Sequence, residues 1–210
     1  NDKLTSVTDA LNWATAYNYD VMNRLVSVEN AASKTTSITY DKNGNKKTVV
    51  DPNGHTQTYS YNDNNRLINY RDAASNNYAY GYDRSGNNTI LTKPTGTITK
   101  LFDAVNRVVT VNNSTGDNYH FTYDDNDNII AMNNSNGTTN MIYDSLNQLK
   151  QYQDPYSNIV SFTYDATGKK TSVIYPASKT VTYSYDDANN LKSVTDWLSH
   201  TFTYTYDAAG

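Results

Sequence analysis

Aromatic and polar side chains alternate along this chain in short runs that recur at a nearly constant interval. Within a run, an aromatic residue occupies every second position and a small or polar residue lies between, as at Tyr78, Tyr80 and Tyr82. Strict alternation with period two is typical of a β-strand with one apolar and one hydrophilic face. No segment shows the 3.6-residue periodicity of a helix. The pattern therefore predicts an all-β protein.

Each run ends in an aromatic residue followed by Asp or Asn. Ten such pairs occur at spacings of 20 or 21 residues, which indicates ten tandem units in a single array over residues 1–210. We interpret the pairs as the structural signature of the repeat. They are Tyr19-Asp20, Tyr40-Asp41, Tyr61-Asn62, Tyr82-Asp83, Phe102-Asp103, Tyr123-Asp124, Tyr143-Asp144, Tyr164-Asp165, Tyr185-Asp186 and Tyr206-Asp207.

A second apolar position follows each aromatic residue by nine residues, and turn-forming sequences lie on both sides of it. Asp41-Lys42-Asn43-Gly44-Asn45 is an example of the first turn and Asp51-Pro52-Asn53-Gly54 of the second. Each repeat is thus a β-hairpin unit of strand, turn, strand and turn. The nine-residue spacing is kept in the repeats that are only 20 residues long. The residue that these repeats lack must therefore lie after the second strand. The second apolar positions are Val28, Val49, Tyr70, Leu91, Val111, Met132, Tyr152, Val173 and Val194.

Alternate repeats differ at the fourth residue of the first turn. Five repeats have Asn there, and the intervening five have Gly or Asp. The pattern predicts a double unit of about 42 residues whose two members contact different neighbours. The two sets are Asn23, Asn65, Asn106, Asn147 and Asn189, and Gly44, Gly86, Asp127, Gly168 and Gly210.

A single two-stranded hairpin is marginally stable at best, so neighbouring hairpins must pair edge to edge. Ten repeats give about 20 strands, and sheets of more than about 10 strands curl. We therefore expect one continuous antiparallel sheet wound into a spiral or shell. The array starts at Asn1 and stops at Gly210 in phase, without polar caps, so we expect a segment of a longer repeat chain.

Composition limits the partners and the chemistry. Apolar residues make up 37% of the chain, 20 of them tyrosines, and 17 basic residues face 21 acidic ones. Without a basic surplus, nucleic-acid binding is not expected. No apolar stretch is long enough for membrane insertion, and the lack of cysteine excludes disulfides and thiolate metal sites.

The polar residues give no pattern of an enzyme or of a cofactor site. The aspartates recur because every turn needs one, whereas a catalytic pair would be singular. Asp124, Asn126 and Asn128 resemble the start of a calcium loop without its glycine and its distal glutamate. His55, His120 and His200 lack metal-ligand spacing. We expect no catalytic residue, no metal and no cofactor.

The sequences Tyr40–Asn45 and Tyr19–Leu25 read Tyr-Asp-x-x-Gly-Asn and Tyr-Asp-x-x-Asn-Arg-Leu. With ten copies at this spacing, the chain resembles the YD or RHS repeats of bacterial polymorphic toxins, wall-associated proteins, insecticidal toxin-complex shells and animal teneurins. The resemblance implies hairpins wound into a hollow shell, which in bacterial members commonly encloses a C-terminal toxin. The core motif, the self-cleavage aspartates and the toxin domain of that family have no counterpart in this sequence.

Three functions are open. The first is a non-enzymatic scaffold, a shell or stalk segment of a secreted or cell-surface bacterial protein that encloses or displays a C-terminal toxin. The second is an adhesion or carbohydrate-binding module that uses exposed tyrosines and the indoles of Trp13 and Trp197, although a cross-strand tyrosine ladder explains the tyrosines as well. The third is a self-associating extracellular filament, formed through uncapped strand edges.

Overall fold

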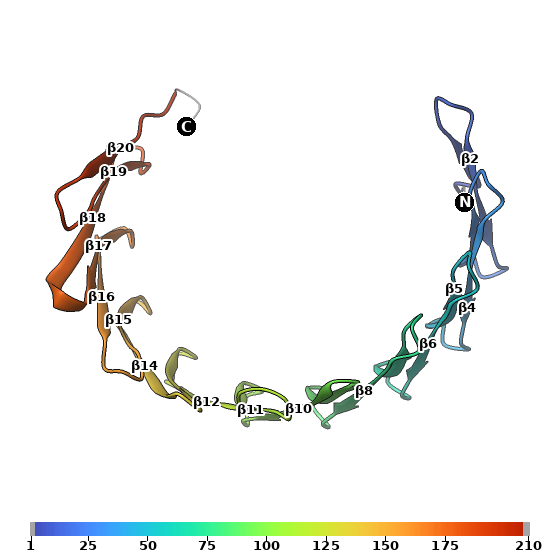
Figure 1. The fold of residues 1–210 in the computed structure, drawn as a ribbon, viewed down its shortest axis with the longest axis horizontal. Helices are drawn as coiled ribbons and strands as arrows, with labels where there is room; N and C mark the ends of the chain where they lie inside the picture. The colour runs from blue at the N-terminus through green and yellow to red at the C-terminus, as the bar shows by residue number, and fades with distance from the viewer. Residues whose placement is uncertain (1–2, 208–210) are drawn as a thin grey trace. The chain divides into compact units, whose positions relative to one another are not determined.

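The computed structural model describes residues 3–207, which form twenty β-strands and one short 3₁₀ turn (Figure 1). All twenty strands are assigned to one antiparallel sheet, and this confirms the all-β prediction. Within β1–β10 and within β11–β20, each strand pairs with the next one along the chain, as β2 with β3 and β3 with β4. None of the helical segments in the described part is long and apolar enough to cross a membrane.

Backbone contacts group the chain into two compact units. The first consists of Asn1–Arg107 with Asn113–Gly116, and the assignment of residues 1–210 to a single array stays a prediction. The strands of this unit are β1 (Ser6–Thr8), β2 (Ala14–Tyr19), β3 (Leu25–Glu29), β4 (Thr35–Tyr40), β5 (Lys46–Val50), β6 (Thr56–Tyr61), β7 (Leu67–Arg71), β8 (Asn77–Tyr82), β9 (Asn88–Lys93) and β10 (Gly96–Phe102).

The second unit consists of Val108–Asn112 with Asp117–Gly210 and repeats the same architecture. Its elements are β11 (Val108–Asn113), β12 (Tyr119–Tyr123), β13 (Ile129–Asn134), β14 (Gly137–Tyr143), β15 (Leu149–Gln153), β16 (Ile159–Tyr164), β17 (Lys170–Tyr175), the 3₁₀ turn η1 (Pro176–Ser178), β18 (Lys179–Tyr185), β19 (Leu191–Thr195) and β20 (Thr201–Thr203).

The first turn of each repeat adds one residue to the ladder. Between β4 and β5 the register shifts after Thr39, so that Tyr40 pairs with Lys46. The Asp41 N–H donates to the Asn45 carbonyl at 2.9 Å, and Gly44 takes a φ of 88°. This is a hairpin turn with a bulge, which requires a residue that tolerates positive φ. Asn, Gly or Asp occupies the equivalent position of the other first turns, but Gly210 lies outside the described residues.

The two 20-residue repeats are shortened in their second turns. Lys93 pairs with Gly96 and Asn134 pairs with Gly137, so only two residues connect these strands. The corresponding connection between β3 and β4 has five residues, 30–34. The deletion thus lies after the second strand, and this prediction is confirmed.

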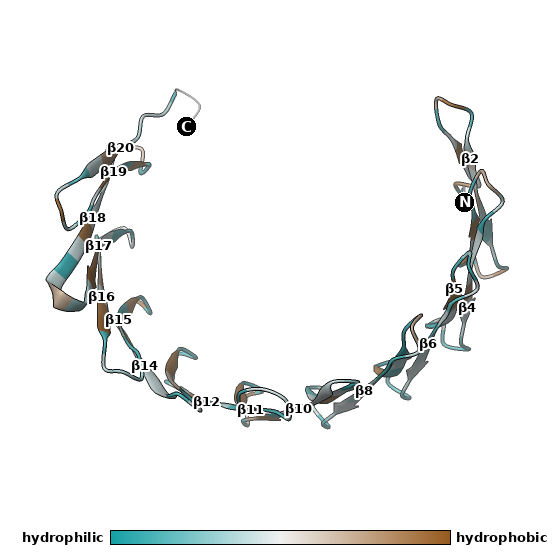
Figure 2. Ribbon diagram, in the orientation of Figure 1, coloured by the Kyte–Doolittle hydropathy of each residue, from teal (hydrophilic) through white to brown (hydrophobic). Residues whose placement is uncertain are grey.

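One face of the sheet carries a row of apolar cross-strand pairs, and strands carry both brown and paler or teal residues (Figure 2). Tyr17 faces Val28 and Phe162 faces Val173 across adjacent strands. Among residues 3–207, only Val173 and Thr139 are buried, each with 4% of its surface exposed. The core is therefore a single layer of half-buried side chains, and each hairpin depends on its neighbours.

Candidate functional site

The signature tyrosines connect successive hairpins through their hydroxyl groups. The Tyr40 hydroxyl at the end of β4 donates to the Leu25 carbonyl at the start of β3, at 2.8 Å. In the described part, seven tyrosines make this bond to a carbonyl fifteen residues earlier, at 2.7–3.0 Å. The pairs are Tyr19 with Leu4, Tyr40 with Leu25, Tyr82 with Leu67, Tyr123 with Val108, Tyr164 with Leu149, Tyr185 with Lys170 and Tyr206 with Leu191.

Both signature residues that end a 20-residue repeat depart from this arrangement. Phe102 has no hydroxyl, and the Tyr143 hydroxyl donates to the Met141 sulfur, at 3.9 Å. Tyr61, in a repeat of normal length, also makes no bond of this kind among the described residues. The backbone bond is therefore a recurrent contact of the 21-residue repeats and is absent where the second turn is shortened.

The aspartate of each signature pair organises the first turn. Asp41 Oδ1 accepts the backbone N–H groups of Asn43 and Asn45 at 2.9 and 2.8 Å, and its Oδ2 accepts the Asn45 side-chain amide at 3.0 Å. Where the fifth turn residue is arginine, its Nε donates to the same oxygen, as Arg24 does to Asp20 at 2.7 Å. These carboxylates are hydrogen-bond acceptors for the turn.

The same bonds shift the acidity of the turn aspartates. The backbone N–H of Arg24 lowers the pKa of Asp20 below its usual value. The side-chain amide of Asn87 lowers the pKa of Asp83 in the same way, and the Thr167 hydroxyl lowers that of Asp165. A donor that bonds to the ionised form stabilises it. The carboxylates are therefore held as anions by their own turns.

The fifth residue of the first turn also reaches the following repeat. The Arg24 guanidinium lies over the Tyr40 ring, 4.5 Å from its centroid, and its Nη1 lies 3.9 Å from the position a Cβ on Gly44 would take. Lys3, Arg66 and Lys169 lie over the rings of Tyr19, Tyr82 and Tyr185 in the same way, at 4.5–4.9 Å. A cation over an aromatic face is attracted by the ring quadrupole.

The alternation of Asn and Gly turns follows from these contacts. Where the next turn carries Gly, a long side chain from the preceding turn occupies the free space, since a Cβ on Gly86 would lie 3.1 Å from Arg66 Nη1. At three Asn turns the Oδ1 accepts an amide from the preceding turn, as Asn65 does from Asn45 at 2.8 Å, whereas the backbone carbonyls of Asn23 and Asn189 accept a lysine instead. The members of a double unit thus meet different neighbours, as predicted from the sequence. Asn106 and Asn147 accept from Asn87 and Asn128 at 2.8 and 3.0 Å.

The third repeat departs from the signature at Asn62. Its Oδ1 accepts the backbone N–H groups of Asn64 and Arg66 at 3.1 and 3.0 Å, as an aspartate would. Arg66 Nε, however, is buried and has no partner in the described structure. The carboxylate oxygen that receives the equivalent Nε in Asp20 and Asp103 is replaced by an amide nitrogen, which is a donor.

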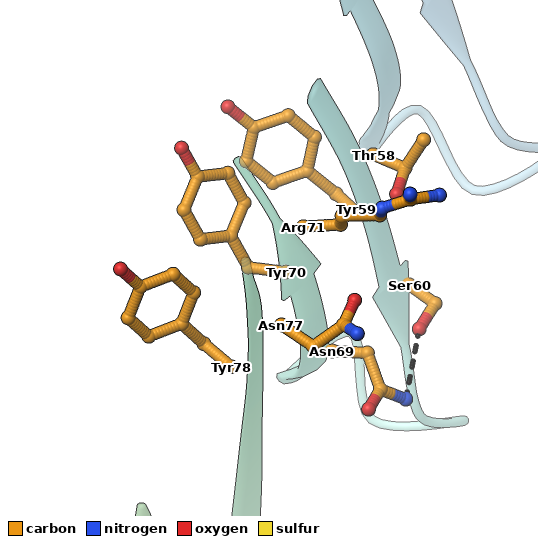
Figure 3. Close-up of a pocket in the computed structure, with 8 residues that line it drawn as sticks. All are labelled: Thr58, Tyr59, Ser60, Asn69, Tyr70, Arg71, Asn77 and Tyr78. Carbon is orange, nitrogen blue, oxygen red and sulfur yellow. Dashed lines mark hydrogen bonds between the residues drawn. The ribbon is translucent and has the colours of Figure 1, made fainter. Parts of the chain in front are cut away.

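The third repeat also holds the longest aromatic ladder. The rings of Tyr59, Tyr70 and Tyr78 lie on one side of strands β6, β7 and β8, with centroids 5.0 and 5.5 Å apart (Figure 3). On the other side, the Asn69 amide donates to Ser60 Oγ at 3.2 Å, beside a hollow of about 290 Å³. Because the rings pack on one another, they hold the sheet as a cross-strand ladder.

The remaining polar candidates are parts of turns and strands. His55 and His200 contact Asp51 and Asp196 at 2.9 and 3.0 Å, each in the fifth position of a second turn. Asp124 Oδ1 accepts the N–H groups of Asn126 and Asn128, so the residues that resembled a calcium loop bond to one another. His120 lies 3.2 Å from the Thr110 hydroxyl on the adjacent strand.

Sequence reasoning missed the contacts that join the repeats. The acceptor of each tyrosine hydroxyl is a backbone carbonyl, and a carbonyl leaves no trace in the residue pattern. The recurrence of Lys, Arg, Asn or Gln at the fifth turn position was a usable signal. These side chains bond to the preceding aspartate and to the next turn at once, as Asn45 does.

Antiparallel hairpins in tandem, most of them joined to the preceding one by the hydroxyl of a signature tyrosine, define a β-hairpin repeat protein of the YD type. The sequence model of the teneurin YD-shell family matches residues 1–109 and 87–210, and the chain belongs to that family. This confirms the YD or RHS resemblance. None of the curated proteins compared with the chain matches it.

Solved structures of toxin complexes share the fold. The crystal structure of TcdB2-TccC3-Cdc42 superimposes with a TM-score of 0.68 and 15% identity over 93% of this chain. The crystal structure of TcdB2-TccC3 without its hypervariable C-terminal region gives 0.55 and 14% over 98%, and the Tc holotoxin pore of Photorhabdus luminescens gives 0.51 and 16% over 95%. The chain spans only 12–14% of the length of these proteins.

Proposed function

We propose that the chain is a non-catalytic wall segment of a YD shell, in which the signature residues serve to hold successive hairpins together. The observation that carries the proposal is the recurrent bond from the hydroxyl of seven signature tyrosines to the backbone of the preceding hairpin. A wall of this kind has almost no buried core of its own and needs uninterrupted neighbours. Membership of the YD-shell family supports a structural shell scaffold.

The proposal extends to the longer protein that such a segment would belong to. In it, the sheet winds into a spiral wall that encloses or displays a C-terminal toxin, and the protein is secreted or held at the cell surface of a bacterium. The similarity to TcdB2-TccC3 structures supports this extension, because one of them is described by the removal of a hypervariable C-terminal region. This segment spans only a small part of the length of those chains, which supports a longer array.

Limited proteolysis of the natural full-length chain tests the enclosure. We expect the domain that follows the repeats to resist protease at concentrations that digest the same domain when it is expressed alone. Electron microscopy of the same sample should show a hollow particle. A C-terminal domain digested at the same rate in both forms would overturn the enclosure and leave the wall or stalk.

Light scattering distinguishes the wall proposal from the proposal of a self-associating filament. The wall proposal expects one molar mass over a wide concentration range. A mass that rises with concentration would favour head-to-tail association instead, since a strand edge without a partner is a template for pairing with another chain.

A further inference from the structure

Trp13 occupies a turn position that other repeats fill with a hydrogen-bonding side chain. In the second turns at 51–55, 72–76, 154–158 and 196–200, the fifth residue is His or Asn, and it lies 2.8–3.0 Å from Oδ2 of the turn aspartate. In the turn between β1 and β2 the fifth residue is Trp13, and 62% of its surface is exposed. The indole contributes no such bond to its turn.

With tryptophan at this position, only one of the two carboxylate oxygens of the turn aspartate has a hydrogen-bond partner in the described structure. Asp9 Oδ1 accepts the backbone N–H groups of Leu11 and Trp13 at 2.8 and 2.9 Å. Its Oδ2 has no partner within the described residues. A carboxylate oxygen in the lining of a hollow without a protein donor is available to a ligand.

Trp13 lines two hollows, which its own turn and the turn at 30–34 form together. One, of about 250 Å³, is lined by Val7, Asp9, Trp13, Thr15 and Asn30 with the two alanines that follow. The other, of about 330 Å³, is lined by Leu11, Asn12, Trp13, Ala31 and Ala32. The indole is therefore a wall shared by two concave surfaces.

The first hollow also offers a free donor and a free hydroxyl. Asn30 Oδ1 accepts the N–H groups of Ala32 and Lys34, both at 3.0 Å, which fixes the amide and leaves its Nδ2 without a partner in the described structure. The Thr15 hydroxyl likewise has no partner there. A carboxylate, an amide, a hydroxyl and an indole thus line one hollow, and no lysine or arginine lines it.

We propose that this hollow binds a neutral hexose unit of an oligosaccharide. The apolar C–H face of a pyranose ring packs on the Trp13 indole, while Asp9 Oδ2 accepts from sugar hydroxyls and Asn30 Nδ2 donates to one of them. An acidic sugar would meet the Asp9 carboxylate without a compensating cation. A second sugar unit can pack on the other side of the indole, against Leu11 and Ala32. The proposal is independent of the wall function.

The test is a titration of the chain followed through its two indole N–H signals in ¹H–¹⁵N NMR spectra. The probes are lactose, cellobiose and N,N′-diacetylchitobiose, with glucuronic acid as the charged comparison. Trp197→Phe assigns the two signals. It also serves as the matched control, because Trp197 is exposed by 48% but packs against Tyr175, at 6.3 Å between centroids.

We expect at least one neutral disaccharide to shift the Trp13 signal saturably. Trp13→Ala should weaken that binding about tenfold or more, and Trp197→Phe should change it less than about twofold. Asp9→Asn, which keeps the acceptor for the turn, should weaken binding without lowering the unfolding midpoint of the chain.

Three outcomes would overturn the proposal. No saturable shift with any neutral probe would mean that the hollow docks something else, such as a protein loop. Equal binding of glucuronic acid would contradict the neutral class. Binding that survives Trp13→Ala would place the site elsewhere. Because folding is followed separately by far-UV circular dichroism, none of these results bears on the wall function.

Discussion

The hydroxyl of Tyr40 and the carbonyl of Leu25 lie 2.8 Å apart, and the same bond recurs from one repeat to the next. Tyrosine rather than phenylalanine at the signature position is therefore explained by one hydrogen bond to the backbone. The bond joins two hairpins that otherwise meet through a strand ladder and a single layer of side chains. Tyr143, which ends a shortened repeat, keeps the ring but lacks the bond to the backbone.

This contrast gives the first prediction. Tyr40→Phe removes the hydroxyl and leaves the Leu25 carbonyl without that donor, so it should lower the free energy of unfolding by about 1 kcal/mol. Tyr143→Phe is the matched control and should have almost no effect. Urea unfolding followed by circular dichroism measures both. Equal losses in the two variants would show that the hydroxyl bond is not what the signature tyrosine contributes.

The unpartnered Nε of Arg66 gives the second prediction. Asn62→Asp places a carboxylate oxygen where Arg24 and Arg107 already find one, at 2.7 Å in both cases. The substitution should stabilise the chain by about 1 kcal/mol, because a buried donor gains a charged acceptor. A rise in the urea midpoint checks it.

The reverse substitution at a regular repeat is the control for Asn62→Asp. Asp20→Asn should lower the urea midpoint, because Arg24 Nε then faces an amide nitrogen as Arg66 does. If Asn62→Asp were neutral or destabilising while Asp20→Asn lowered the midpoint, Arg66 would not need the partner that the other repeats provide.

Much of the hairpin could be predicted from the sequence because each part has a local physical cause. Alternation gives the strands, and the Asp-x-x-Gly turn around Gly44 gives the positive φ. The contacts between repeats were harder to predict from the sequence. The Arg66 defect depends on one amide in place of a carboxylate, and the hollow beside Trp13 depends on the turn at 30–34, which is remote from the turn that carries the indole.

The lowered acidity of the turn carboxylates gives the third prediction. The pKa values of Asp20, Asp83 and Asp103 lie below the ordinary value of 3.8, chiefly because donors in the turn bond to the ionised form. A carboxyl whose pKa is lower in the folded state contributes stability above its unfolded pKa and loses it as the pH falls through the folded pKa. The thermal midpoint should therefore stay level from pH 7 to about 5 and fall below about pH 4.

The acid sensitivity has its own control. Asp20→Asn removes one of the titrating groups, so the midpoint of that variant should fall less between pH 5 and 3 than the midpoint of the unsubstituted chain. A midpoint that is constant or rising over this range would contradict the role of the carboxylates as anionic acceptors.

The alternation of turns gives the last prediction, which concerns whole repeats. Deleting residues 41–82 joins Tyr40 to Asp83, so Arg24 again meets a glycine turn, with Gly86 in place of Gly44. Deleting residues 41–61 instead joins Tyr40 to Asn62. Arg24 then faces Asn65 in place of Gly44, and Asn65 loses the amide of Asn45. Both deletions keep the hairpin register and the aromatic face.

We therefore expect the 42-residue deletion to retain a cooperative thermal transition with a midpoint close to that of the intact chain. The 21-residue deletion should show a lower midpoint. If the two deletion variants unfold at the same temperature, the double unit is a sequence pattern without an effect on stability. A lower midpoint for the 21-residue deletion alone would establish the pair of hairpins as the unit from which the wall is built.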